Sequence, residues 1–142
     1  MSLTVAEREE FLAQPHIAAI SVVAGSGRGP LTVPIWYSYR PGGDVLVITG
    51  AQSRKAGLIA EAGRFSLMVE TMTPQQVCYV SVEGPVVRTE AGTDAMVRTM
   101  ATRYMPPDRL EAYLAMAKAL HGEQVAISMR PEHWLSRNLV PV

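Results

Sequence analysis

The residues best placed to do chemistry are Ser53, Arg54 and Lys55, which follow an apolar segment ending in Thr49-Gly50. Ser53 is a natural N-terminal cap, and the residues after it, RKAGLIAEA, are typical of a short helix. The first N–H groups of a helix and its positive dipole end attract an anion, and two basic side chains add full charges. This arrangement predicts a binding site for the phosphate of a cofactor or substrate. A solvated first helical turn is the alternative interpretation.

Two neighbouring aromatic residues, Trp36 and Tyr37, could form a wall against a ring-shaped ligand. They lie in a segment, residues 31–40, in which apolar and polar residues alternate as they do in a strand. Large aromatic residues in strands more often belong to a core or an interface, so both interpretations stay open.

No metal site is expected from the histidines. His16, His121 and His133 are far apart in the sequence, and none has a histidine or acidic residue three or four positions away. Cys78 lies in the middle of a predicted strand, where buried and unreactive thiols are common. The sequence therefore identifies no catalytic residue.

The elements that must position these residues follow from the hydrophobic periodicity. Pro34 cannot donate a hydrogen bond between strands, so the strand over 31–40 is expected to be bulged or edge-like there. From Pro131 the chain is expected to form a tail. The other predicted strands cover residues 16–23, 45–50, 65–71, 77–87 and 123–129, and the predicted helices cover 5–13, 54–62, 93–104 and 107–120.

This order predicts a mainly β, α+β fold: a six-stranded antiparallel barrel, closed or partly closed. A short helix follows the third strand and a helical pair precedes the last strand. The strand over 77–87 is expected to bend at Gly84-Pro85, which suits neither strand geometry nor pairing. Closure of the barrel protects strand edges, and all 142 residues are expected to form one domain.

Composition excludes several classes of protein. Thirteen basic and thirteen acidic side chains give a net charge of zero, which argues against a general binder of nucleic acid or anionic membranes. One cysteine permits no intrachain disulfide, and this fits a reducing cytoplasm. The N-terminal residues lack the apolar run of a signal peptide, and no segment reaches the ~18 apolar residues of a membrane span. A cytoplasmic protein is expected.

Six segments together resemble one family. They read, in order, EREEFLAQPHIAAISV, GRGPLTVPIWYSY, GGDVLVITG, SRKAGLIAEAGRFSLMVE, YVSVEGPVV and AISMRPEHWLS. The chain resembles the pyridoxamine 5'-phosphate oxidase-like split β-barrels that bind flavin or deazaflavin, and the likeness covers almost its whole length. The resemblance implies a homodimer with two equivalent cofactor sites at the subunit interface, and a small-molecule substrate.

The resemblance also implies which residues bind the cofactor. The phosphate is expected at Lys55, with Arg54 and Ser53 beside it. The ring system is expected along Val33, Pro34, Ile35 and Trp36, with Ile48, Thr49 and Gly50 from the next strand. By analogy, Tyr79 and the tail around Trp134 approach from the other subunit.

One departure from the family pattern concerns the residues after the lysine. Many relatives have Arg-Asn where this chain has Gly57-Leu58, which weakens the argument for a strong phosphate grip. The cofactor is expected to be the deazaflavin F-420, with FMN as the alternative. Arg130 and His133 keep a true pyridoxamine 5'-phosphate oxidase as a less favoured alternative.

Three hypotheses for function remain. The favoured one is an oxidoreductase that passes a hydride between the bound cofactor and a small, conjugated organic substrate, with the proton delivered by solvent or a tyrosine. The second is a non-catalytic protein that binds or sequesters flavin, deazaflavin or a tetrapyrrole. The third is a structural dimer whose site has lost its function.

Overall fold

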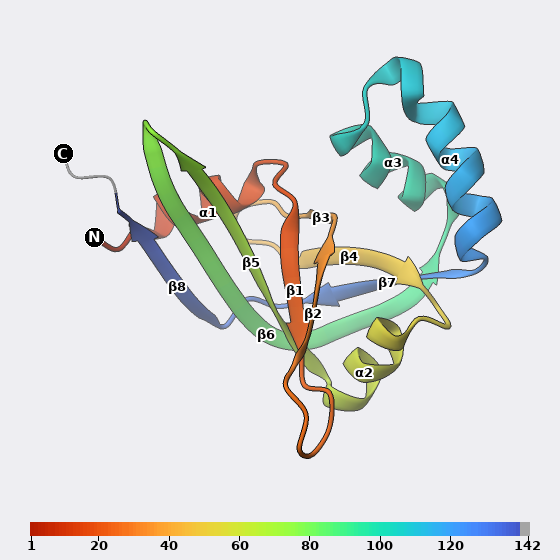
Figure 1. Cartoon of the computed structure of the whole chain (residues 1–142), viewed down its shortest axis with the longest axis horizontal. Helices are drawn as coiled ribbons and strands as arrows, with labels where there is room; N and C mark the ends of the chain where they lie inside the picture. The colour runs from red at the N-terminus through yellow and green to blue at the C-terminus, as the bar shows by residue number, and fades with distance from the viewer. Residues whose placement is uncertain (140–142) are drawn as a thin grey trace.

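The computed structural model describes residues 1–139, which form an eight-stranded sheet and four helices (Figure 1). The helices are α1 (Val5–Ala13), α2 (Arg54–Ala62), α3 (Asp94–Tyr104) and α4 (Pro107–His121). The strands are β1 (Ala18–Val22), β2 (Leu31–Ile35), β3 (Tyr37–Ser38), β4 (Val45–Gly50), β5 (Arg64–Thr73), β6 (Gln76–Gly92), β7 (Gln124–Met129) and β8 (His133–Asn138).

The long strand β6 joins the two halves of the sheet. Its first part pairs with β5 and β8, and its last part pairs with β7. The strand order is β2-β1-β5-β6-β7-β4-β3, with β8 on β6, and every pairing is antiparallel. Figure 1 shows β6 curving across the whole molecule, with α2 below its second half and the α3–α4 pair beyond β4 and β7. The predicted α+β split barrel is confirmed.

Buried and partly exposed residues alternate along the strands, because successive side chains point to opposite faces of the sheet. The buried face lines a core inside the curved sheet. Apolar side chains of this size each contribute about 1.5–3 kcal/mol when they are fully buried. Side chains that are no more than 1% exposed include Ile20 on β1, Val45 and Val47 on β4, Leu67 and Val69 on β5, and Val80 and Val82 on β6.

The strand predicted over 31–40 is interrupted at Trp36, so this prediction is wrong in one respect. Before Trp36, β2 pairs with β1, and after it, β3 pairs with β4. The chain changes partners at this residue, and a single alternating pattern in the sequence therefore covers two strands. Trp36 lies between them, outside either ladder.

The tail predicted from Pro131 is a strand over most of its length. Residues His133–Asn138 form β8, which pairs with β6 from Glu83 to Cys78. Apolar and polar residues alternate only weakly in its sequence, HWLSRN. The strand forms because β6, which is distant in sequence, offers an edge for pairing. Together, the division at Trp36 and this strand raise the predicted six strands to eight.

The ends of the short helices follow local rules. The N–H of Glu7 donates to Thr4 Oγ1 at 3.1 Å and the N–H of Thr4 donates to Glu7 Oε1 at 2.9 Å, which is a capping box. Helix α2 is capped at its C-terminal end by Gly63, whose φ of 71° is left-handed and suits glycine. Both helices therefore span the residues predicted from the sequence. Within residues 1–139, no helix combines the length and the apolar character needed to cross a membrane.

The ring of His16 contacts Phe11 of α1, and its titration is expected to make stability depend on pH. Its Nε2 donates to the carbonyl oxygen of Phe11 at 2.9 Å, and its ring stacks on that of Phe11. Burial lowers the pKa of His16 below its ordinary 6.5, the bond to Phe11 partly offsets this, and Arg103 lowers it further. A lowered pKa in the folded state means that stability is present above about pH 6.5 and falls as pH drops through the folded pKa.

We therefore expect the wild-type melting temperature to fall between about pH 7 and about pH 5.5, where carboxylates titrate little. In His16→Gln, which cannot take up the proton, this fall should be smaller. Thermal unfolding of both proteins at the two pH values measures it. An equal fall in both would show that His16 does not cause it.

Candidate functional site

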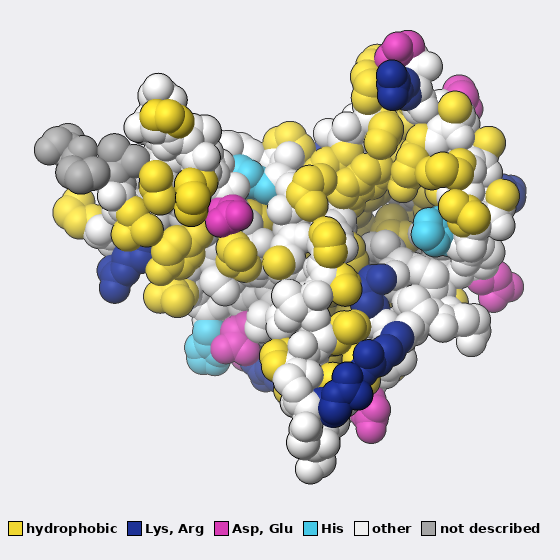
Figure 2. Space-filling view, in the orientation of Figure 1, with side chains coloured by type: hydrophobic (Ala, Val, Ile, Leu, Met, Phe, Trp, Pro, Cys, Tyr) yellow, Lys and Arg dark blue, Asp and Glu magenta, His cyan; other side chains and the backbone are white. Residues whose placement is uncertain are grey.

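A cavity of about 540 Å³ lies between the sheet, the start of α2 and the α3–α4 pair. Figure 2 shows the hollow on this face, with apolar side chains above it and basic side chains near α2 below. Its lining comes from β2, the Trp36 junction and β4 on one side, and from α3, α4 and Gln124 on the other. The cavity therefore forms only where segments distant in sequence meet.

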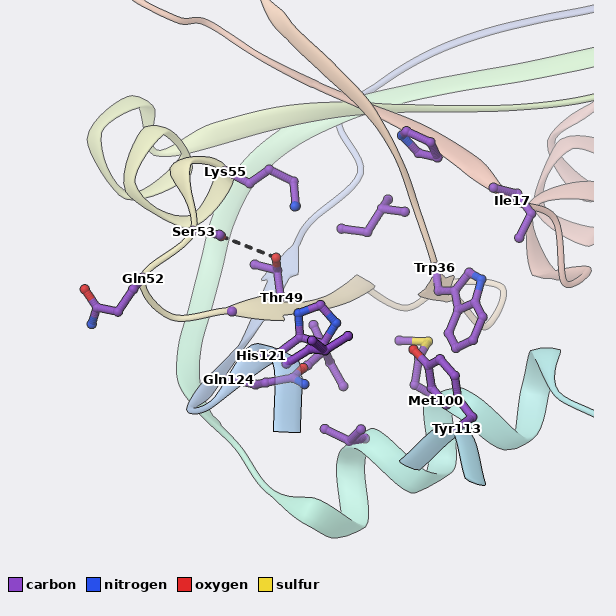
Figure 3. Close-up of a pocket in the computed structure, with 16 residues that line it drawn as sticks. Ile17, Trp36, Thr49, Gln52, Ser53, Lys55, Met100, Tyr113, His121 and Gln124 are labelled. Carbon is purple, nitrogen blue, oxygen red and sulfur yellow. Dashed lines mark hydrogen bonds between the residues drawn. The ribbon is translucent and has the colours of Figure 1, made fainter. Parts of the chain in front are cut away.

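The end of the cavity at α2 is polar. The hydroxyl of Ser53 lies 3.4 Å from that of Thr49 and accepts the N–H of Ala56 at 3.2 Å. The N–H of Gly57 donates to the Ser53 carbonyl, which leaves the N–H groups of Arg54 and Lys55 without a partner inside the helix. The side chain of Lys55 extends into the cavity (Figure 3), and within residues 1–139 it makes no ion pair. This end can hold a phosphate.

The rest of the cavity is apolar and aromatic. Ile35, Trp36 and Ile48 line it from the barrel, and Met100 lines it from α3. Methionine adapts its shape to flat ligands as well as to irregular ones. A planar ring with one phosphate-bearing arm matches both ends of the cavity.

Arg103, at the end of α3, attaches the helical pair to the rest of the chain. Arg103 donates to the carbonyl oxygens of Tyr37 at 2.9 Å, Ala13 at 3.0 Å and Gln14 at 2.9 Å. Hydrogen bonds from a charged donor are stronger than neutral ones, contributing about 1.5–3 kcal/mol each. The wall of the cavity formed by α3 is therefore fixed to strand β3 and to the C-terminal end of α1.

Tyr104 and Tyr113 flank the indole of Trp36. The ring of Tyr104 stacks on it at 4.8 Å with an angle of 9°, and the ring of Tyr113 lies at 5.0 Å with an angle of 40°. Burial raises the pKa of Tyr113, so its phenol stays protonated at neutral pH. The indole is thus held in place by both helices of the pair and presents its remaining surface to the cavity.

The structure brings together eight of the twelve residues predicted to bind the cofactor. These line the cavity: Pro34, Ile35, Trp36, Ile48, Thr49, Gly50, Ser53 and Lys55. The other four, Val33, Arg54, Tyr79 and Trp134, do not line it.

Each of those four has another environment in this chain. Val33 packs against the core, Arg54 is exposed on the first turn of α2, and Tyr79 pairs in register with Glu70 on β5. Trp134 packs edge-on to Tyr39 and lies under the guanidinium of Arg8, 4.5 Å from its ring centre.

The two residues that replace the Arg-Asn of many relatives lie away from the cavity. Gly57 is exposed and Leu58 packs against the core, so neither contributes to the lining. Arg130 and His133 are also exposed and outside it, and Arg130 pairs with Glu132 at 3.3 Å. Among residues 1–139, no group of three His, Cys, Asp or Glu side chains could hold a metal ion.

Sequence reasoning missed the side of the cavity contributed by the helical pair, and three residues from other segments, Ile17, Gln52 and Gln124. The missed residues are Ile17, Gln52, Val97, Met100, Tyr113, Leu120, His121 and Gln124. Tyr113 was the available signal, because a tyrosine on the apolar stripe of α4 has a polar group that needs a partner.

The sequence profile of the family described as Pyridoxamine 5'-phosphate oxidase matches residues 4–138. The chain belongs to this family. The resemblance found in its motifs is thereby confirmed. No curated protein sequence matches the chain.

Solved structures show that the pyridoxamine 5'-phosphate oxidase fold extends over nearly the whole chain. An F420 reductase aligns with a TM-score of 0.68 at 19% identity, covering 89% of this chain and 94% of the other. A conserved hypothetical protein from Mycobacterium tuberculosis gives 0.71 at 20% identity, with 96% and 85% covered. An FAD binding protein from Mycobacterium smegmatis gives 0.61 at 16% identity, with 99% and 100% covered.

Proposed function

We propose that this protein is an oxidoreductase that binds a phosphate-bearing flavin-type cofactor in the cavity and transfers a hydride to or from a small organic substrate. The deazaflavin F-420 is the favoured cofactor and FMN is the alternative. The observation that carries the proposal is the pairing of Lys55 and the start of α2 at one end of the cavity with the Trp36 wall at the other. Structural likeness to an F420 reductase and an FAD binding protein supports a ligand of this class.

The residues present fit such a cofactor. Lys55 and the first N–H groups of α2 would hold its phosphate, while Ile35, Trp36 and Ile48 would lie along its ring. The bound cofactor supplies the hydride chemistry. The chain's part is to hold the phosphate, to exclude water from the ring with apolar side chains and to orient the substrate.

We further propose that the protein acts as a homodimer. Large apolar side chains, Met72 on β5 and Leu135 on β8, are 73% and 56% exposed on this chain. Exposed apolar patches mark interaction surfaces, and a second copy would cover them. In this arrangement, the partner subunit's Tyr79 and the partner subunit's Trp134 approach the cavity.

A fluorescence titration of the purified protein with F-420, with FMN as competitor, tests the cofactor. We expect F-420 to bind and FMN to displace it poorly. Displacement by FMN would make the protein a flavoprotein, and binding of neither ligand would contradict the proposal.

Catalysis is tested separately from binding. We expect reduced F-420 bound to the protein to be reoxidised when a conjugated acceptor is added, faster than the same mixture without protein. A bound cofactor that stays reduced would instead favour a protein that binds or sequesters it.

A further inference from the structure

Helix α4 has few contacts with the rest of the chain. Of its 15 residues only Ala117 is buried, and Figure 1 shows the α3–α4 pair projecting from the sheet. In the described part of the chain no hydrogen bond joins α4 to a strand, and its one ring contact with the barrel is that of Tyr113 with Trp36. Helix α3, by contrast, is bonded to the barrel through Arg103 and Tyr104. Of the two helices, α4 is therefore the one that is free to move.

Cavities border α4 on two sides. The cavity of the candidate site, of about 540 Å³, separates it from the barrel, and Tyr113, Leu120 and His121 line that cavity from α4. A second cavity, of about 910 Å³, lies between α3, α4, the end of β6 and the start of β7. Side chains beside an empty space lack attractive contacts on that side. Packing therefore holds α4 only weakly in place.

Two ion pairs attach α4 to α3. Arg98 of α3 donates two hydrogen bonds to the carboxylate of Glu111, at 2.6 Å and 3.2 Å, and Lys118 of α4 donates to Asp94 at 3.2 Å. The hydrogen bond from Arg98 lowers the pKa of Glu111, so this pair is ionised at neutral pH. All four side chains are more than half exposed, and an exposed ion pair contributes little to stability. The attachment is therefore easy to break.

The connections at the two ends of α4 allow it to turn. Met105 and Pro106 are extended between α3 and α4, and Pro106 provides no capping hydrogen bond. Gly122 follows the last turn with a φ of 57°, and a Cβ at this position would meet nothing within 4 Å. When a lid opens, a few residues at the ends of an element absorb the change in backbone angles. Rotation at these two connections would move the α4 side of the cavity away from the barrel.

We infer that α4 is a lid over the cavity, which opens by separating from α3 and from Trp36, and which its two ion pairs to α3 hold closed. This inference rests on the proposed function, which places the cofactor in the cavity. Opening of the lid then sets how fast the cofactor enters and leaves.

Charge reversal at Glu111 tests the lid through the kinetics of cofactor binding. Glu111 does not line the cavity of the candidate site, so the substitution removes no contact with the ligand. In Glu111→Arg, repulsion from Arg98 should open the lid more often, and we expect the association and dissociation rate constants of F-420 to rise together by about threefold. Kd should change less, because the lid affects both rates. Stopped-flow fluorescence measures them, with FMN as the ligand if FMN is the cofactor that binds.

The double variant Arg98→Glu/Glu111→Arg is the matched control, because it restores an ion pair with the two charges exchanged. We expect its rate constants to return to those of the wild type. Rate constants that stay raised would show that the ion pair does not hold the lid closed. Unchanged rate constants in Glu111→Arg would overturn the inference, and so would a rise in the dissociation rate constant alone, which would indicate a damaged site.

A measurement without ligand separates the lid from the proposed function. Trp36 and Trp134 are the only tryptophans, so Trp134→Phe leaves Trp36 as the sole fluorescent indole. We expect acrylamide to quench Trp36 more strongly when Glu111→Arg is added, because Tyr113 then leaves the indole more often. If neither F-420 nor FMN binds while quenching rises and the exchanged pair reverses it, the lid stands and the cofactor assignment fails. If a cofactor binds and neither its rate constants nor the quenching respond, only the lid is wrong.

Discussion

Lys55→Ala is expected to weaken F-420 binding by about 10- to 100-fold, because a hydrogen bond to a charged group contributes about 1.5–3 kcal/mol. Lys55 lines the polar end of the cavity and makes no ion pair within residues 1–139, so the substitution removes no contact that stabilises the fold. The melting temperature of the cofactor-free protein should therefore change little. Fluorescence titration and thermal unfolding of the same preparations measure both quantities.

Arg54→Ala is the matched control for this prediction. Arg54 neighbours Lys55 in sequence and carries the same charge, but it is exposed and does not line the cavity. Water and salt screen an exposed charge, so we expect a loss of affinity of no more than about threefold. Equal losses in the two variants would mean that the general positive potential of α2 binds the cofactor and that Lys55 has no specific role.

The sequence predicted features whose causes are local. The caps Thr4 and Ser53 and the stop at Gly63 define α1 and α2 because each hydrogen-bonds or turns the chain within a few residues. The eight predicted residues that meet at the cavity come from β2, the Trp36 junction, β4 and the start of α2, which lie close together along the chain. The location of this end of the cavity could therefore be predicted before any tertiary contact was known.

Features that depend on distant pairing could not be predicted. β8 exists because β6 offers it an edge, and the α3–α4 pair reaches Trp36 because Arg103 and Tyr104 bond to carbonyls more than 60 residues away. No periodicity in the residues of α4 shows that Tyr113 faces a cavity, since its stripe is equally typical of a core helix. The α3–α4 side of the cavity thus became visible only in the folded chain.

Gly84→Ala is expected to have the largest effect on stability of any single methyl group added to this chain. A Cβ at Gly84 would overlap the carbonyl oxygen of Arg130, where the connection from β7 to β8 crosses β6. That connection cannot move aside, because the N–H of Arg130 donates to Pro85 and the N–H of Glu132 donates to Glu83, both at 2.9 Å. The clash is therefore between two segments of backbone that are hydrogen-bonded on either side of it.

We expect Gly84→Ala to lower the free energy of unfolding by about 3 kcal/mol and the melting temperature by roughly 10 °C. Gly57→Ala supplies the opposite control, since a Cβ on this exposed helical glycine meets nothing within 4 Å. Replacing a helix glycine by alanine stabilises by about 0.5–1 kcal/mol. Chemical and thermal unfolding of both variants measure the two effects. A Gly84→Ala protein as stable as the wild type would mean that the β7–β8 connection does not cross β6 at this point, and the barrel would then have to close differently.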